Sequence, residues 1–208
     1  DVLPRVMSDT PSYKAYIFGE NGVIRKRLRE GVGGFRLDVA DELSDEFLSE
    51  LKTAAETEKK DCVIIGEVWE NAAEKISYGR RRKYLRGKEL DSVMNYPIRT
   101  AIISYLREGD CATFLQNVTT VYDEYPPEAQ SVLMNIIGTH DTERIITALA
   151  GESPVGKSQD EKAVYKMTDE QYEKGAELVK AAYLLSMVLP GVPCIYYGDE
   201  AGMQGYSD

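Results

Sequence analysis

The sequence predicts an α/β fold in which short strands alternate with helices. Two observations support this prediction. Apolar runs of strand length recur along the chain, and the stretches between them carry apolar residues at helical spacing, with no low-complexity linker. The expected strands are 35–39, 62–65, 92–95, 132–137 and 193–197. Such runs are typical of parallel strands buried on both faces. Because the alternation continues without a low-complexity linker or a short repeat, we expect one α/β unit rather than two domains.

The first two expected helices have recognisable ends. One begins at Thr10 and Pro11, and Gly31 ends the helical stretch before the first strand. The next begins at Ser44, which is followed by acidic residues suited to a helix amino terminus. The apolar residues expected on one face of this helix are Phe47, Leu48, Leu51 and Ala55.

The second half of the chain contains further expected helices. One opens at Pro97 and ends near Gly109, and another runs to the break at Pro126. A helix through Ile145 and its apolar neighbours follows the fourth strand.

A polar stretch and a long helix precede the fifth strand. Residues 151–167 are polar and punctuated by Gly and Pro, so we expect an exposed excursion. Thr168 and Gln171 have the spacing of a capping box, in which side chain and backbone at the helix start bond reciprocally. The helix that they predict ends before Pro190.

Composition limits the classes of function. With 208 residues and 43% hydrophobic content the chain can bury a full core, and it lacks an apolar run of membrane-spanning length. A net charge of −10 argues against binding to the phosphate backbone of a nucleic acid, which needs an extended basic surface. We therefore expect neither a nucleic-acid nor a membrane partner. We interpret the basic cluster at 80–88 as a solvated loop. A cytoplasmic location is expected, although a signal peptide on a longer parent stays open.

Three acidic residues, Asp38, Glu67 and Asp141, each follow an apolar strand-like run. In barrels of parallel strands, the rim formed by the carboxyl ends of the strands is where catalysis occurs. Each acid alone could instead cap the helix that follows it. That alternative fits the three together poorly, because Arg36 lies two residues before Asp38 and His140 directly precedes Asp141.

Two architectures are compatible with this pattern. Five strands cannot close an eight-stranded barrel, which usually needs about 250 residues. The chain is therefore a doubly wound sheet or a piece of a barrel, and periodicity does not distinguish them. A glycine-rich nucleotide-binding signature after a strand would favour the doubly wound sheet, and this sequence has none.

Three motifs resemble a known family. They are GFRLDVA at 34–40, GEVW at 66–69 and GTHDTER at 138–144. In order and approximate spacing they resemble the signature segments of the alpha-amylase family of glycoside hydrolases. YGDEAGM at 197–203 resembles the family's segment after barrel strand eight, so the resemblance covers essentially the whole chain. LPRVM at 3–7 is similar to a stretch of the neopullulanase, cyclomaltodextrinase and maltogenic amylase branch, with Met7 in place of Asn.

The resemblance implies a partial TIM (β/α)8 barrel, with about strands four to eight and their helices. Residues 1–208 would form the C-terminal portion of the catalytic domain, and strands one to three would be absent. The family's first signature segment, an Asp-x-x-x-Asn-His, is not found in this sequence.

The resemblance also implies an activity. It is that of a retaining glycoside hydrolase acting on α-1,4-glucosidic bonds of maltooligosaccharides, cyclodextrins or related α-glucans. Asp38 would be the nucleophile, Glu67 the general acid/base and Asp141 the transition-state stabiliser. Retention needs one carboxylate that attacks the anomeric carbon and one carboxyl group that protonates the leaving oxygen. Arg36 lies on the same strand face as Asp38, whereas no cation neighbours Glu67 in sequence.

Four further residues are expected to bind the α-glucan substrate. Arg36 and His140 lie beside the acids, and Trp69 would stack on a sugar ring or simply pack. Asp208 resembles an aspartate that in this branch contacts the glycone sugar. Residues 41–42 are Asp-Glu where many alpha-amylases have Lys-His, which puts the usual calcium site in doubt, so neither a metal nor another cofactor is expected.

Two other classes of function stay open. In a metal-dependent barrel enzyme, strand-end carboxylates would bind Mg²⁺, but Arg36 and His140 would repel the ion. A noncatalytic carbohydrate-binding module would not need the complete set of three acids. For the chain alone we expect open sheet edges, little activity and self-association, for example as a homodimer.

Overall fold

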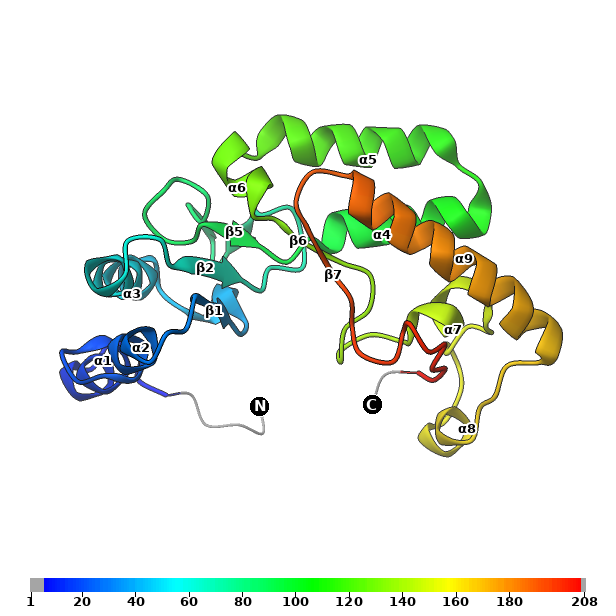
Figure 1. Ribbon diagram of the computed structural model, residues 1–208, viewed down its shortest axis with the longest axis horizontal. Helices are drawn as coiled ribbons and strands as arrows, with labels where there is room; N and C mark the ends of the chain where they lie inside the picture. Colours follow the sequence, from blue (N-terminus) through cyan, green and yellow to red (C-terminus); the bar gives the residue numbers. More distant parts are fainter. Residues whose placement is uncertain (1–5, 207–208) are drawn as a thin grey trace. The chain divides into compact units, whose positions relative to one another are not determined.

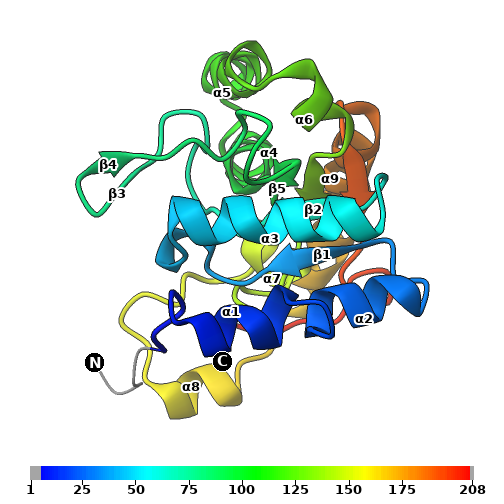
Figure 2. The ribbon, with the colours of Figure 1, turned by 90° about the vertical axis from the view of Figure 1, so that its left-hand side faces the viewer.

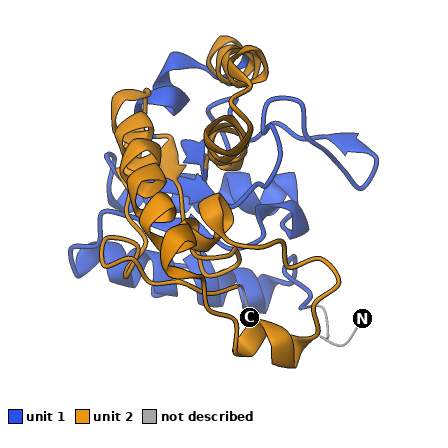
Figure 3. Ribbon diagram, turned by 90° about the vertical axis from the view of Figure 1, so that its right-hand side faces the viewer, with its two compact units in different colours: residues 1–94, 124–132 blue, residues 95–123, 133–208 orange. Residues whose placement is uncertain are grey.

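The computed structural model describes residues 6–206 (Figure 1). They belong to two compact units. Among the described residues, the first comprises 6–94 and 124–132, and the second comprises 95–123 and 133–206 (Figure 3). Each unit carries a small parallel sheet and its own helices. No helix within the described range is long and apolar enough to cross a membrane.

The sheet of the first unit has three parallel strands in the order β1-β2-β5. They are β1 (Gly34–Leu37), β2 (Val63–Gly66) and β5 (Ser92–Val93). The strands are shorter than the apolar runs predicted. β1 ends early because Val39, with φ of 41°, has a left-handed backbone that a strand does not accommodate.

Three helices pack together in the first unit: α1 (Pro11–Phe18), α2 (Val23–Arg29) and α3 (Asp45–Glu58). The helical stretch expected before the first strand is two helices, because the backbone turns to extended values at Gly19 and Gly22. The predicted start of α3 is confirmed, since the Ser44 hydroxyl accepts a hydrogen bond from the backbone of Phe47. The predicted apolar face is also confirmed, and its four residues are buried.

The basic segment between β2 and β5 begins with a hairpin of β3 (Ile76–Ser77) and β4 (Arg80–Arg81), which Figure 2 shows. The interpretation of the whole cluster as solvated is wrong for Arg82, which is buried. Its guanidinium donates to the backbone oxygens of Asp41 (2.9 Å) and Leu43 (2.6 Å) and pairs with Asp45 (2.8 Å). Arg82 therefore fixes the chain that follows β1. The short helix α6 (Pro127–Ser131) also belongs to this unit.

The second unit contains the parallel pair β6 (Met134–Ile136) and β7 (Val192–Cys194). Three of its helices, α4 (Tyr96–Glu108), α7 (Ile145–Ala150) and α9 (Asp169–Val188), pack against one another. The remaining helices are α5 (Cys111–Glu124), whose last residue is assigned to the first unit, and α8 (Gln159–Ala163).

The ends of these helices follow local sequence signals. Gly109 adopts the left-handed conformation after α4, and the Thr168 capping box starts α9 as predicted. The excursion 151–167 is largely exposed, as expected, and it contains α8. Its capping box, formed by Ser158 and Glu161, has the same spacing and was missed.

The expectation that the strands are buried on both faces is wrong for β1 and β7. β1 is half-buried along its length, and in β7 both Val192 and Pro193 are exposed. Among residues 6–206 each of these strands pairs with only one other strand, so one edge of each lacks a neighbour. Instead of one five-stranded sheet, the described residues form a three-stranded and a two-stranded parallel sheet.

Candidate active site

The register of β1 and β2 places Asp38 and Glu67 at the same end of the first sheet. Leu37 pairs with Gly66, the last residue of β2, and the two acids are the next residues on each strand. The backbone N–H of Glu67 donates to the oxygen of Leu37 over 2.9 Å, which extends the pairing by one step. The predicted placement of both acids at strand carboxyl ends is therefore confirmed.

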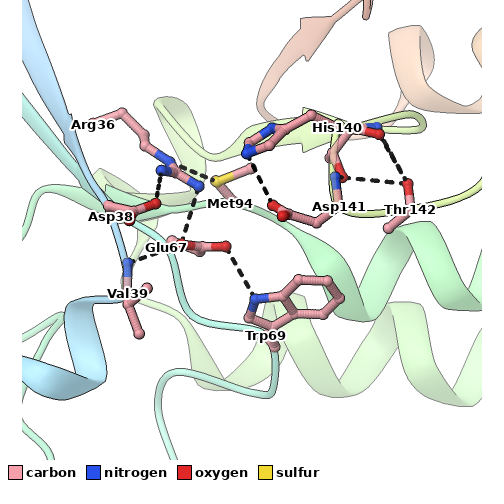
Figure 4. Close-up of polar contacts among 10 residues, drawn as sticks. Arg36, Asp38, Val39, Glu67, Trp69, Met94, His140, Asp141 and Thr142 are labelled. Carbon is pink, nitrogen blue, oxygen red and sulfur yellow. Dashed lines mark hydrogen bonds and ion pairs between the residues drawn. The ribbon is translucent and has the colours of Figure 1, made fainter. Parts of the chain in front are cut away.

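Arg36 links these two acids (Figure 4). Its Nη1 lies 2.5 Å from Asp38 Oδ1, and its Nη2 lies 3.0 Å from Glu67 Oε2. Although no cation neighbours Glu67 in sequence, the parallel register brings the Arg36 side chain of the adjacent strand to it. One guanidinium fork therefore orients both carboxylates.

Glu67 is almost completely buried, with 5% of its side chain exposed, whereas the side chain of Asp38 is 76% exposed. Besides Arg36, Glu67 accepts hydrogen bonds from the backbone N–H of Val39 (2.8 Å) and from Trp69 Nε1 (3.0 Å). Both of its oxygens are thus held in place, while Asp38 is open to an incoming molecule. This asymmetry suits two carboxyl groups with different tasks.

Trp69 lies close to Glu67 and is 46% exposed. The sequence left open whether this residue stacks on a sugar or only packs. Its indole N–H orients the Glu67 carboxylate, a contact that neither alternative included. Met94 is a second contact that the sequence did not predict, since its sulfur lies 3.3 Å from Nε of Arg36. No sequence signal pointed to Met94, because the contact joins β1 to a residue after β5.

The second unit carries the remaining predicted pair. Nε2 of His140 lies 3.2 Å from Oδ2 of Asp141, and both side chains are accessible (Figure 4). The buried Thr139 organises the turn, because its Oγ1 accepts from the backbone N–H of Asp141 and its own N–H donates to Thr142 Oγ1. The sequence reasoning missed both threonines, although they flank the acid within the same motif.

Asp208 and residues 3–5 lie outside the described residues. The carboxylate of Asp41, the first residue of the Asp-Glu pair, is bound by other side chains of this chain. It pairs with Lys75 over 2.9 Å and accepts a hydrogen bond from the Tyr84 hydroxyl over 2.5 Å. Within residues 6–206, no group of three or more His, Cys, Asp or Glu side chains is arranged to hold a metal ion.

The sequence model of the alpha amylase catalytic domain matches residues 3–207. Relatives include a cyclomaltodextrinase from Geobacillus thermopakistaniensis at 30% identity and a maltogenic alpha-amylase from Bacillus acidopullulyticus at 31%. A third is neopullulanase 2 from Thermoactinomyces vulgaris, at 31%. Each alignment covers 99% of this chain but only 30% of the relative, so the chain spans less than a third of the length of these proteins.

Solved structures give the same result. A cyclic alpha-maltosyl-(1→6)-maltose hydrolase from Arthrobacter globiformis matches with a TM-score of 0.75 at 27% identity, over 96% of this chain and 38% of that one. A cyclomaltodextrinase matches with a TM-score of 0.74 at 29% identity, over 97% of this chain and 29% of that one. Family, relatives and neighbours agree with the motifs, and the chain belongs to the alpha-amylase catalytic-domain family.

Proposed function

We propose that this chain carries the catalytic acids of a retaining glycoside hydrolase. Its substrates are the α-1,4-glucosidic bonds of maltooligosaccharides, cyclodextrins or related α-glucans, and its reaction proceeds through a covalent glycosyl-enzyme intermediate. The observation that carries the proposal is the guanidinium of Arg36, which binds Asp38 and Glu67 at paired strand ends. The names of the relatives, a cyclomaltodextrinase, a maltogenic alpha-amylase and a neopullulanase, support the substrate class.

The architecture proposed for the chain is part of a (β/α)8 barrel. In this proposal β1, β2, β5, β6 and β7 are barrel strands four to eight, and residues 1–208 are the C-terminal portion of a catalytic domain in a longer protein. Support comes from the parallel pairing within both sheets and from the much greater length of the relatives. In such barrels the catalytic residues lie at the carboxyl ends of the strands.

Asp38 acts as the nucleophile in the proposed mechanism. Its exposed carboxylate attacks the anomeric carbon, the bond to the leaving oxygen breaks, and an ester forms between sugar and enzyme. Glu67 donates its proton to the leaving oxygen and later removes a proton from the water that hydrolyses the ester. The two carboxyl groups would lie about 5–5.5 Å apart, as retention requires.

The remaining residues bind and distort the sugar. Asp141, with His140 beside it, would hold sugar hydroxyls in the transition state. Trp69 offers an accessible ring on which a sugar can stack, and Arg36 and Asp208 complete the proposed contacts. No metal takes part in this scheme. A cytoplasmic location and a homodimer that pairs open strand edges are further parts of the proposal.

The test is an assay of the longer protein that carries this chain. It should hydrolyse starch or cyclodextrin, and proton NMR should show the α-anomer of the new reducing end first, because two inversions at carbon give net retention. Initial release of the β-anomer would overturn the retaining mechanism. Activity that a chelator abolishes would instead support the metal-dependent alternative.

A further inference from the structure

Asp199 is a buried acid that the proposed mechanism does not use. It follows β7 within the YGDEAGM motif and is only 2% exposed. The hydroxyl of Tyr183 on α9 donates to its Oδ2 over 2.8 Å, and Nη1 of Arg144 lies 3.5 Å from its Oδ1. Burial raises the pKa of the Asp199 carboxyl, while Tyr183 and Arg144 act in the opposite direction.

This carboxyl group touches both ends of the segment that carries Asp141. At one end, a Cβ added to Gly138 would lie 2.2 Å from Oδ2 of Asp199, so the carboxylate rests directly against the glycine backbone. At the other end is Arg144, the ion-pair partner. Gly138 and Arg144 are the first and last residues of the GTHDTER motif. Asp199 therefore contacts the segment at both ends and Asp141 lies between them.

Arg144 makes further contacts with the segment that follows β7. Its backbone N–H donates to the oxygen of Gly205 over 3.0 Å, and its side chain donates to the backbone oxygen of Tyr197. Its guanidinium also lies over the rings of Tyr196 (4.7 Å) and Tyr197 (4.8 Å). The segment after Asp141 is thereby tied to the segment after β7.

The side chain of Asp141 depends on this support, because it pairs with the exposed His140 rather than with a buried group. Its direction is set by the backbone, through the turn that Thr139 and Thr142 make. We propose that Asp199 is a positioning residue for Asp141, which holds the 138–144 segment at both ends so that Asp141 meets the sugar. This inference rests on the proposed function and deepens it.

A purely structural role predicts a different outcome. Removal of one partner of a buried ion pair usually destabilises a protein, because the other charge is left without its partner. If Asp199 served only the core, Asp199→Asn would lower the melting temperature through the loss of the Arg144 pair and leave kcat of the folded protein intact. If it positions Asp141, the same substitution lowers activity without unfolding the protein, because misplacement of a catalytic group by about 1 Å can cost about 10²-fold in rate.

The first arm uses the longer protein and two neighbouring acids. Measured below its melting temperature, Asp199→Asn should lower kcat at least about tenfold and leave KM nearly unchanged. Glu200→Gln is the matched control, since Glu200 is the adjacent exposed acid, and its kcat should equal that of the wild type. Tyr183→Phe removes only the hydroxyl that holds Oδ2 and should act in the same direction as Asp199→Asn, more weakly.

A double-mutant cycle separates positioning from general damage. In an Asp141→Asn background, assayed with an activated glycosyl fluoride, Asp199→Asn should cause almost no further loss, because its effect passes through Asp141. Full additivity of the two losses, or wild-type kcat in Asp199→Asn, would overturn the proposal.

The second experiment uses NMR and does not need catalysis. It therefore tests the positioning role of Asp199 even if the wild-type protein proves inactive. In the longer protein the ring proton resonances of His140 are assigned by their loss in a His140→Gln variant. Asp199→Asn should shift or broaden them at fixed pH, whereas Glu200→Gln should not. Unchanged His140 resonances in Asp199→Asn would contradict the inference, and an inactive wild type alone would contradict only the proposed function.

Discussion

Nη2 of Arg36 lies 3.0 Å from Oε2 of Glu67, across two neighbouring parallel strands. The other nitrogen of the same guanidinium holds Asp38. Because the fork of an arginine has a fixed shape, it sets the two carboxylates relative to each other as well as to the sheet. The account of the site depends on this geometry.

Arg36→Lys should therefore impair catalysis although it keeps the charge. A lysine ammonium is a point charge and does not reproduce the fork, so one carboxylate loses its partner. We expect kcat/KM of the longer protein to fall by about 10²-fold. The matched control is Arg27→Lys, in an exposed pair with Glu30, which should leave kcat/KM unchanged. An active Arg36→Lys variant would show that the fork is dispensable.

Glu67→Gln should discriminate between substrates. The amide lacks the proton that a poor leaving group needs, so hydrolysis of glucans should fall by about 10²- to 10⁴-fold. Glycosyl fluorides need no protonation to leave, and their first step should persist. The measurement compares burst and steady-state rates on both substrates. Glu70→Gln, at an exposed acid near Glu67 in sequence, is the control and should keep the wild-type rates. Equal losses on both substrates would argue against a role as general acid.

Glu89 should make the stability of the protein depend on pH. It is 4% exposed, its Oε2 lacks a hydrogen-bond partner, and burial, with a smaller contribution from Asp45, raises the pKa of its carboxyl from about 4.5 to about 7. The unfolded chain then loses its proton at lower pH than the folded chain. Stability should fall by about 3 kcal/mol as the pH rises from about 4.5 to about 7, and stay level above.

Urea unfolding across this pH range checks the prediction. Glu89→Gln should remove the decline between about pH 4.5 and 7, and it should be more stable than the wild type at pH 8. Glu128→Gln, at an exposed acid of the same unit, should keep the wild-type pH profile. An unchanged profile in Glu89→Gln would mean that this carboxyl group ionises equally in the folded and unfolded states.

The 208-residue chain alone should have at least about 10²-fold less activity than the longer protein and should self-associate. Among the described residues, β1 and β7 each pair with a single strand, and unpaired strand edges are templates for association. A nucleophile without its full supporting shell is also easily misplaced. Sedimentation velocity and a maltooligosaccharide assay test both parts. A monomer with the rate of the longer protein would contradict them.

Local signals in the sequence predicted much of the fold. The helix starts at Ser44 and Thr168 depend on contacts within one turn, and such contacts can be read from spacing alone. The acids at the ends of β1 and β2 followed from apolar runs that stop at a carboxylate. The short helix α8 was missed because its surroundings are polar and rich in turn residues, which outweighed its capping box.

Contacts between distant segments could not be predicted in the same way. The pairing of Arg36 with Glu67 depends on strand register, and the burial of Arg82 depends on backbone carbonyls around residues 41–43. The role proposed for Asp199 depends on a contact with Gly138, 61 positions earlier in the numbering. Spacing within a motif carries no information about such approaches, because tertiary packing determines them.

The central claim is that Asp38 forms a covalent bond with the sugar. A slow fluorinated glycosyl fluoride should trap this ester in the longer protein, and peptide mass spectrometry should locate the added sugar on Asp38. Asp38→Asn, nearly isosteric but unable to form the ester, should show neither adduct nor turnover while keeping its melting temperature. An adduct on another residue, or full turnover by Asp38→Asn, would contradict the account.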